Sequence, residues 1–248
     1  MATPVRLNKF IAASGLCSRR AADRLIREGR VRVNGKVVTE LGMRIVPDQD
    51  EVYVGKRRIE PQVEKIYLLL NKPKGIITTR HDERGRRTVM DLLPPSMRSK
   101  VFPVGRLDRT TTGVLLLTND GILAHALMHP SMAVEKIYRV VLDRSLTHRD
   151  LHRLIEGIEL EDGVAMADEA VVLSADRTEV GVRLHLGRNR IIRRMFEQLG
   201  YRVQRLDRTV FAGLTKKNLP RGKWRPLSPK EVRLLYRRIP KALGRQKK

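Results

Sequence analysis

The spacing of apolar residues over the first 58 positions predicts a small unit of two helices and a hairpin. Apolar side chains recur at helical spacing over residues 7–11, and Gly15 ends the helix that they predict. Ser18 can cap a second helix, which Gly29 ends. The run VRVNGKVV then places Asn34-Gly35 between β-branched residues, which is typical of a two-residue hairpin turn. We assign residues 1–60 to this first domain.

A longer and less regular pattern follows the polar segment IEPQVE. We predict a linker at residues 61–65, a second domain at 66–236 and a disordered basic tail at 237–248, which has almost nothing to bury. The order of elements in the second domain lacks the regular alternation of a doubly wound fold, so we predict an α+β fold with a mixed, largely antiparallel sheet flanked by helices. The pattern predicts strands at 66–70, 114–117, 137–142 and 183–186, and helices at 122–128 and 191–199.

The 248-residue chain is strongly basic. Lys and Arg number 51 against 27 Asp and Glu, which gives a formal net charge of +24. This excess predicts a polyanionic partner. A membrane surface is the weaker candidate, because the basic stretches mostly lack a sustained amphipathic helix with bulky aromatic residues. The apolar runs are far shorter than the roughly 20 residues of a membrane helix, and MATPVRLNKF has no apolar signal region. We therefore expect a cytoplasmic protein.

Metal and nucleotide cofactors have little support in the sequence. Cys17 is the single cysteine, which excludes an intrachain disulfide and a Cys-rich zinc site. His125 and His129 are four residues apart, as are His148 and His152, but neither pair has the Glu of a metalloprotease helix after its first histidine. The phosphate-binding pattern GxxxxGK[ST] is also absent. We expect no metal and no nucleotide cofactor.

Six arginines gather on the second predicted helix and the turn after it, with Asp23 and Glu28 to balance them. A solvated helix face is the ordinary explanation of a charge run, but so large an excess is better explained by phosphate contacts. The six are Arg19, Arg20, Arg24, Arg27, Arg30 and Arg32. The whole stretch RLNKFIAASGLCSRRAADRLIREGRVRVNGKVV resembles the S4 RNA-binding domain, and this resemblance implies structured RNA as the partner.

One carboxylate stands between two arginines just before the most apolar run of the chain. In GRLDRTTTGVLLLTNDG, Arg106 and Arg109 flank Asp108, and the strand predicted at 114–117 would anchor their loop on a rigid element. The residues alone leave two interpretations open. Asp108 is either a surface partner of Arg106, which is slightly favoured, or a reactive group.

The same stretch resembles the central motif GRLDxxTxGLLLLTNDG of the pseudouridine synthases, in the branch that includes small-subunit synthase A and large-subunit synthase B. This chain differs from the motif conservatively at Val114. YLLLNKPKGIITT, residues 67–79, resembles the opening strand and loop of the family's catalytic domain, and the family shares the order of an S4 unit before a catalytic unit. The resemblance implies an rRNA pseudouridine synthase, an isomerase that detaches uracil from its ribose, turns it over and rejoins it through carbon.

The resemblance also implies a catalytic set. Asp108 would be the nucleophile or base, and VEKIYRVVL places the active-site tyrosine at Tyr138, where a tyrosine packed in the core is the ordinary alternative. LGRNRIIRRMFEQLGYRV places the basic partner of the aspartate at Arg193, with Arg194 as the alternative because the sequence does not settle the helix phase. Arg106 is expected to stabilise a uridine flipped out of its stack. Further RNA contacts are predicted at Arg188, Arg190 and Arg194.

The motif GRNR, residues 187–190, is more similar to the motif of synthase B than to that of synthase A, which favours large-subunit (23S) over small-subunit (16S) rRNA as the substrate. A non-catalytic S4-type RNA-binding or ribosome-assembly factor would fit the charge equally well, but it would have no physical reason to keep Asp108, Tyr138 and Arg193 together. A glycoside hydrolase would need a second carboxylate, and Asp120, the near candidate, is better explained as a helix cap. We expect a monomer, because no heptad or exposed apolar stripe indicates a partner chain.

Overall fold

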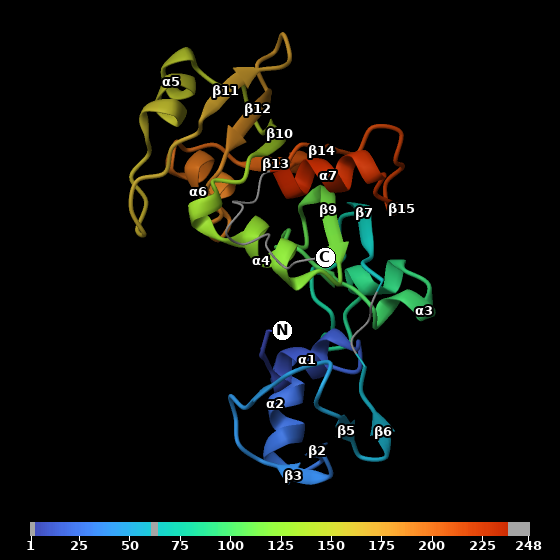
Figure 1. Ribbon diagram of the computed structural model, residues 1–248. Helices are drawn as coiled ribbons and strands as arrows, with labels where there is room; N and C mark the ends of the chain where they lie inside the picture. The colour runs from blue at the N-terminus through green and yellow to red at the C-terminus, as the bar shows by residue number, and fades with distance from the viewer. Residues whose placement is uncertain (1–2, 61–63, 238–248) are drawn as a thin grey trace. The chain divides into compact units, whose positions relative to one another are not determined.

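The computed structural model describes residues 3–60 and 64–237 (Figure 1). The predicted tail therefore lies outside the described residues except for Arg237, and the predicted linker lies outside them except for Glu64 and Lys65. The chain folds as two compact units. One holds the described residues up to Ile66 together with Pro95–Val101, and the other holds Tyr67–Pro94 and the described residues from Phe102 onward.

The N-terminal unit has the two helices and the hairpin that the apolar spacing predicts. The side chain of Ser18 caps the second helix by accepting a hydrogen bond from the Ala21 amide. Asn34 and Gly35 both have positive φ, 50° and 79°, as a type I′ hairpin turn requires. The helices are α1 (Leu7–Ala13) and α2 (Arg19–Arg27). The strands are β1 (Val5–Arg6), β2 (Val31–Val33), β3 (Lys36–Val38), β4 (Arg44–Ile45), β5 (Val52–Val54) and β6 (Arg57–Arg58).

The described residues of the second unit build a nine-stranded sheet with the order β11-β12-β10-β13-β9-β7-β15, to which β14 and β8 add at β13 and β9. Its pairings are antiparallel in the described chain apart from that of β9 with β13, which is parallel. The predicted α+β fold with a mixed, largely antiparallel sheet is therefore confirmed. The strands are β7 (Tyr67–Lys72), β8 (Phe102–Pro103), β9 (Thr112–Thr118), β10 (Lys136–Leu142), β11 (Glu169–Val172), β12 (Glu179–Leu184), β13 (Val203–Phe211), β14 (Leu214–Thr215) and β15 (Trp224–Pro226).

Helices cover this sheet in two groups, each with its own apolar core. In Figure 1, α5 and α6 lie beside β10, β11 and β12, and they share one core with them. A second core joins α4 and α7 to β7 and β9. The helices are α3 (Pro95–Arg98), which belongs to the first unit, and α4 (Gly121–Met128), α5 (His148–Glu156), α6 (Ile191–Gln198) and α7 (Pro229–Arg237), with 3₁₀ turns at Val89–Leu92 and Pro130–Met132. Among the described residues, no helix is both long enough and apolar enough to span a bilayer.

The predicted elements differ from the observed ones mainly at one strand. The strand predicted at 183–186 is β12, which begins four residues earlier, at Glu179, and ends at Leu184. Its burial alternates along the strand, because one face meets the core and the other does not. By contrast, β9 is buried at every position, which agrees with the uninterrupted apolar run that predicted it.

The parallel pair of β9 and β13 depends on a glycine. Gly113 has a φ of +110° and lies opposite Arg208 in the register. A Cβ atom at this position would be 2.1 Å from the Arg208 carbonyl oxygen, so no other residue fits without a shift of the backbone. The strand that follows the GRLD loop can therefore approach β13 closely.

Candidate active site

The GRLD loop enters β9 from a segment whose main chain is fixed by a buried lysine. Lys72, the last residue of β7, is fully buried, and its Nζ donates hydrogen bonds to three carbonyl oxygens. Two of them belong to the loop, Asp108 at 3.1 Å and Thr111 at 2.9 Å, and the third is Pro73 at 3.1 Å. The Thr111 amide also donates to the Asp108 carbonyl, over 3.0 Å. The ammonium group thus ties the end of β7 to the loop at Asp108 and at Thr111.

Two further contacts from the NKPKGIITT segment hold the same loop. The Thr78 hydroxyl donates to the Leu107 carbonyl over 2.8 Å and accepts from the Leu107 amide over 3.3 Å. The Gly75 amide donates to the Arg109 carbonyl over 2.8 Å. Residues on both sides of Asp108 are therefore clamped, and the direction of its side chain is set by the main chain rather than by a free loop.

The charge of Asp108 acts on Lys72. Burial lowers the pKa of the Lys72 ammonium to about 8, and the nearby negative charge of Asp108 opposes that shift. Asp108 is partly exposed, while the aliphatic chain of Lys72 is enclosed. A carboxylate that solvent can reach therefore lies beside a buried cation.

Arg193 supplies a second buried cation to the loop. It lies on α6, its Nη1 donates to the Val203 carbonyl over 2.9 Å, and its Nη2 donates to the Thr110 hydroxyl over 3.3 Å. Burial lowers the pKa of its guanidinium, the charge of Arg190 lowers it further, and Asp108 raises it. Direct ion pairs of Asp108 with Arg193 or Arg106 are absent from the described part of the chain. Arg193 therefore interacts with the Asp108 carboxylate through space, and it holds the loop by its hydrogen bond to Thr110.

The other arginines near α6 are turned toward acids of their own unit. Arg194, the alternative partner of Asp108, forms an ion pair with Asp162 instead, and Arg188 approaches the same carboxylate at 3.6 Å. Arg190 lies 3.7 Å from Glu197 and has a positive φ of 47° at the start of the helix. The three predicted RNA contacts on this segment are therefore partly neutralised, whereas Arg106 is exposed on the GRLD loop.

Tyr138 lies on β10, half-buried against the core that contains α5 and α6. In the register it stands opposite Val182 on one side and Arg208 on the other. Arg208 in turn lies opposite Gly113, so Tyr138 is in the same cross-strand row as the start of β9. The described contacts of its side chain are with this core and with Arg208.

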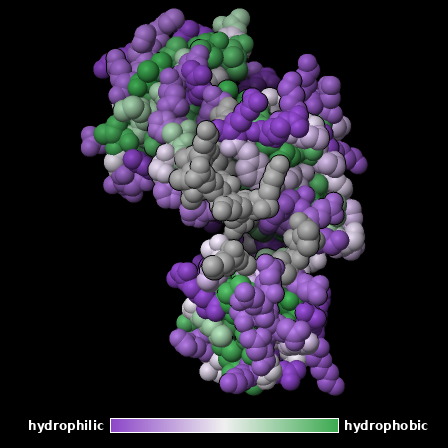
Figure 2. All heavy atoms as spheres, viewed as in Figure 1, coloured by the Kyte–Doolittle hydropathy of each residue, from purple (hydrophilic) through white to green (hydrophobic). Residues whose placement is uncertain are grey.

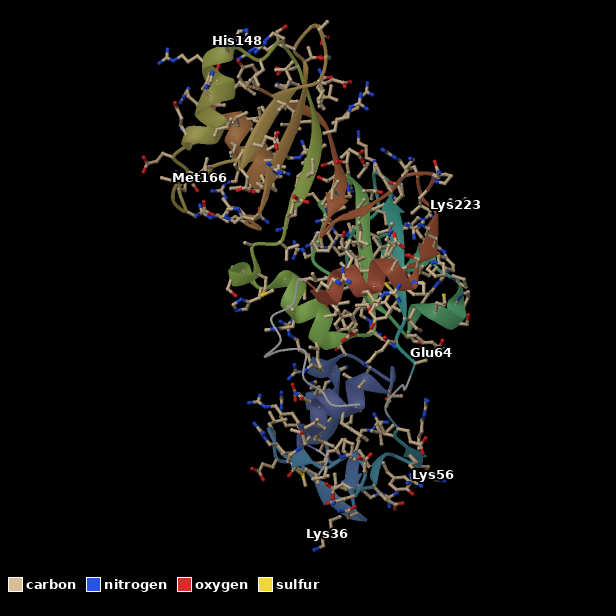
Figure 3. All side chains as sticks on the ribbon, turned by 45° about the horizontal axis from the view of Figure 1, so that its top comes forward. Lys36, Lys56, Glu64, His148, Met166 and Lys223 are labelled. Atoms are coloured by element: carbon tan, nitrogen blue, oxygen red, sulfur yellow. The ribbon has the colours of Figure 1, made fainter. Side chains whose placement is uncertain are left out.

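The six arginines predicted on the N-terminal unit are all exposed. On α2, Arg20, Arg24 and Arg27 follow one another at helical spacing and share a face. The guanidinium of Arg32 lies over the Tyr53 ring, 5.8 Å from its centre. Figure 2 shows hydrophilic side chains over much of the visible face of this unit. Figure 3 labels Lys36, at the start of β3, and Lys56, in the turn between β5 and β6.

Lys72, Thr78 and Arg208 were not among the residues expected from the sequence. Lys72 and Thr78 lie in the segment that resembles the opening of the family's catalytic domain. The sequence feature that could have identified them is their position in this segment, close to an apolar strand. Asp120 does cap α4, as expected, because its Oδ1 accepts from the amides of Ile122 and Leu123. Its Oδ2 accepts from the hydroxyls of Tyr67 and Tyr236.

Comparisons with known proteins identify relatives of both units. The family model described as RNA pseudouridylate synthase matches residues 66–198, and the S4 domain model matches residues 5–52. Ribosomal large subunit pseudouridine synthase B of Bacillus subtilis is 42% identical over 93% of this chain and 95% of its own length. The protein of the same name from Vibrio cholerae is 41% identical over 93% of this chain and 74% of its own length.

A solved structure supports the same assignment. The crystal structure of a pseudouridylate synthase superimposes with a TM-score of 0.68 at 31% identity, and covers 93% of this chain and 99% of that chain. The clamped GRLD loop, the two buried cations beside it and the preceding S4 unit thus occur together in a chain that belongs to the RNA pseudouridine synthase family and is an isomerase of uridine in RNA.

Proposed function

We propose that this enzyme converts one specific uridine of large-subunit ribosomal RNA to pseudouridine, with Asp108 as the nucleophile or base. The proposal is supported by the names of the relatives from B. subtilis and V. cholerae, which match nearly the whole chain, and by the GRNR motif at 187–190. The observation that carries the assignment of Asp108 is its placement, a solvent-accessible carboxylate on a clamped main chain beside two buried cations.

The surroundings of Asp108 suit a reagent that must be negatively charged. Lys72 and Arg193 are buried cations on which the charge of Asp108 acts, so the site offers positive charge to a negatively charged reagent. The clamps at Leu107 and Arg109 hold the main chain still, so the carboxylate needs little reorganisation to reach the sugar or the base. The reaction gains and loses no atoms, and we therefore propose that it needs no cofactor.

Tyr138 and Arg106 complete the proposed site. The half-buried ring of Tyr138 offers a flat surface for the flipped base, and its hydroxyl can exchange a proton there. Arg106 is exposed on the same loop as Asp108 and can hold a phosphate or fill the space that the uridine leaves. If Arg106→Ala left both RNA binding and turnover unchanged, this role would be excluded.

The N-terminal unit would supply affinity. We propose that Arg19, Arg20, Arg24, Arg27, Arg30 and Arg32 contact the phosphates of structured rRNA, since all six are exposed on one small unit. A ribosomal substrate would place the enzyme in the cytoplasm. We propose that it acts there as a monomer. The competing candidate is a non-catalytic rRNA-binding factor with the same fold.

The test uses purified enzyme and unmodified rRNA from the large and the small ribosomal subunits. Pseudouridine is mapped by selective chemical derivatisation, because isomerisation leaves the mass unchanged. We expect one modified position in large-subunit rRNA and no product with Asp108→Asn, which keeps the size of the side chain and removes its charge. Product in small-subunit rRNA would reassign the substrate, binding without product would favour the non-catalytic factor, and full activity of Asp108→Asn would exclude the proposed mechanism.

A further inference from the structure

Arg208 is a buried cation that the proposed chemistry does not use. The residue is 3% exposed, and burial lowers the pKa of its guanidinium. Its Nε donates to the Val114 carbonyl over 2.8 Å, and the guanidinium lies over the Phe211 ring, 4.6 Å from its centre. Within the described structure, its Nη2 is buried and has no hydrogen-bond partner. A buried donor left unpaired is costly, so this one calls for an explanation.

The neighbour of Arg208 across the sheet is Tyr138, the tyrosine of the proposed site. Tyr138 and Arg208 are opposite each other on the antiparallel strands β10 and β13, so their side chains leave the same face of the sheet. The Tyr138 hydroxyl is close enough to raise the pKa of Arg208, against the larger effect of burial. Both the charge and the hydrogen-bonding capacity of the hydroxyl contribute to this effect, although Nη2 itself has no partner at hydrogen-bond distance among the described residues.

The direction of this contact follows from the chemistry of the two groups. A guanidinium has only donors, so the Tyr138 oxygen can meet Arg208 only as an acceptor. The hydroxyl proton must then point away from Arg208. Because Arg208 occupies the buried side and Tyr138 is partly exposed, the remaining directions lead toward the open side of the strand.

We propose that Arg208 is a positioning residue that acts through Tyr138: its free Nη2 donates to the Tyr138 oxygen in the substrate complex and turns the hydroxyl proton toward the uracil. The contact closes when the flipped base excludes water, since a charge-assisted hydrogen bond gains strength in a drier site. This inference rests on the proposed function, in which Tyr138 touches the base.

A purely structural role for Arg208 is the competing explanation, because its Nε also links β13 to β9. The two roles predict different couplings. If Arg208 acts through the hydroxyl of Tyr138, replacing Arg208 should not lower kcat any further in a Tyr138→Phe background. If it acts only on the fold, its effect is the same with or without the hydroxyl.

The experiment is a double-mutant cycle of Arg208→Met and Tyr138→Phe, with kcat and KM measured on the rRNA substrate. We expect Arg208→Met to lower kcat about ten- to a hundred-fold with KM nearly unchanged, the range of a charge-assisted hydrogen bond. The double variant is expected to match Tyr138→Phe within about twofold. Arg208→Lys keeps a buried cation and serves in the same cycle where the methionine variant does not fold.

Arg177 offers a matched control. Its Nε donates to the Leu146 carbonyl over 2.7 Å, and its Nη2 is also buried without a described partner. Arg177→Met is therefore expected to lower stability, and its effect on kcat is expected to be the same with and without the Tyr138 hydroxyl. If the losses of kcat from the Arg208 replacement and from Tyr138→Phe multiply in the double variant, with methionine and with lysine alike, the inference is wrong while the proposed function stands. A wild-type enzyme that forms no pseudouridine would overturn both.

Discussion

Asp108 is fixed through its main chain, and this leaves its carboxylate available for chemistry. The Lys72 ammonium holds the carbonyl of Asp108 itself, and the hydroxyl of Thr78 holds both polar groups of Leu107. A carboxylate tied down by its own hydrogen bonds would be well placed but poorly reactive. Clamping the neighbouring peptide groups fixes its position and keeps its oxygens free to act.

Thr78 gives the sharpest test of this clamp. Thr78→Val keeps the shape of the side chain and removes both hydrogen bonds to Leu107, so the loop gains freedom that the reaction must remove. We expect kcat to fall about tenfold, equivalent to about 1.4 kcal/mol, with a smaller change in KM. Steady-state kinetics on the rRNA substrate measures this, and Thr78→Ser should restore most of the loss.

Thr79 provides a neighbouring control with the same bonding pattern. Its hydroxyl donates to the His81 carbonyl over 2.8 Å and accepts from the His81 amide over 3.4 Å, so it holds the following turn rather than the GRLD loop. Thr79→Val should therefore leave kcat near that of the wild type. Equal losses of kcat in the two valine variants would show that the contact to Leu107 has no special part in turnover.

The sequence identified the reactive candidate but not its support. Asp108 stands out because a long motif surrounds it. Lys72, read along the chain, is one more lysine of a very basic protein, and nothing local predicts that it is fully buried. Two of its three acceptors lie 36 and 39 residues away, so its burial depends on the pairing of β7 with β9. Arg208 escapes prediction for the same reason.

Among the elements, β9 decides where the GRLD loop ends. Its apolar run predicted a strand buried on both faces, and the residues alone were enough for that. They were not enough to show that its parallel neighbour β13 begins about 90 residues later. The apolar pattern predicted β9 and the burial of both its faces, but it predicted no strand at Val203–Phe211, because the pairing of distant segments depends on the whole set of contacts.

Gly113→Ala tests the close approach of these two strands. The new Cβ would meet the Arg208 main chain and would also have to adopt a φ of +110°, so the strands must separate. We expect a loss of about 3 to 5 kcal/mol in the free energy of unfolding, measured by urea denaturation. Gly85→Ala is the control, because Gly85 has a φ of +66° with open space around it and should cost about 1 to 2 kcal/mol. Similar losses in the two variants would contradict the close approach.

At the scale of the whole molecule, charge governs the encounter with RNA. Replacing Arg20, Arg24 and Arg27 together by Ala removes three exposed charges from one face of α2. We expect the slope of log K against log salt to become shallower by about 2 to 3, measured by filter binding or fluorescence anisotropy over a range of salt concentrations.

The matched variant replaces Arg188, Arg190 and Arg194 by Ala. It removes the same formal charge, but Asp162 and Glu197 already neutralise part of it. Its effect on the slope should therefore be smaller. A larger effect from this second triple would mean that the α6 segment, rather than the N-terminal unit, makes most of the phosphate contacts.

Lys136 makes the stability of the whole chain depend on pH. Burial, followed by the charge of Arg208, lowers its pKa to about 8, against about 10.4 in an unfolded chain. Between these values the unfolded state holds a proton that the folded state has released, so stability rises with pH. Below pH 8 both states are protonated and the contribution is constant.

Lys136→Met should remove this rise. From pH 8 to pH 10 the variant's free energy of unfolding should climb less steeply than that of the wild type, by at most about 1.4 kcal/mol per pH unit, and by less because solvent screens a partly exposed group. Denaturant titrations at several pH values measure how the free energy of unfolding of each protein changes with pH. Lys230→Met is the control, because it also removes one ammonium group. Equal slopes for the Lys136 variant and the wild type would refute the assignment.

The parallel pair of β9 and β13 also sets the order of events when the chain is made. Asp108 leaves the ribosome long before Val203–Phe211, yet the Val203 carbonyl that holds Arg193 and the Arg208 main chain that faces Gly113 are both on that later strand. A nascent chain that ends before Val203 therefore carries the GRLD loop without the strand that completes its surroundings. We therefore expect catalytic competence only after β13 has been synthesised and has paired with β9.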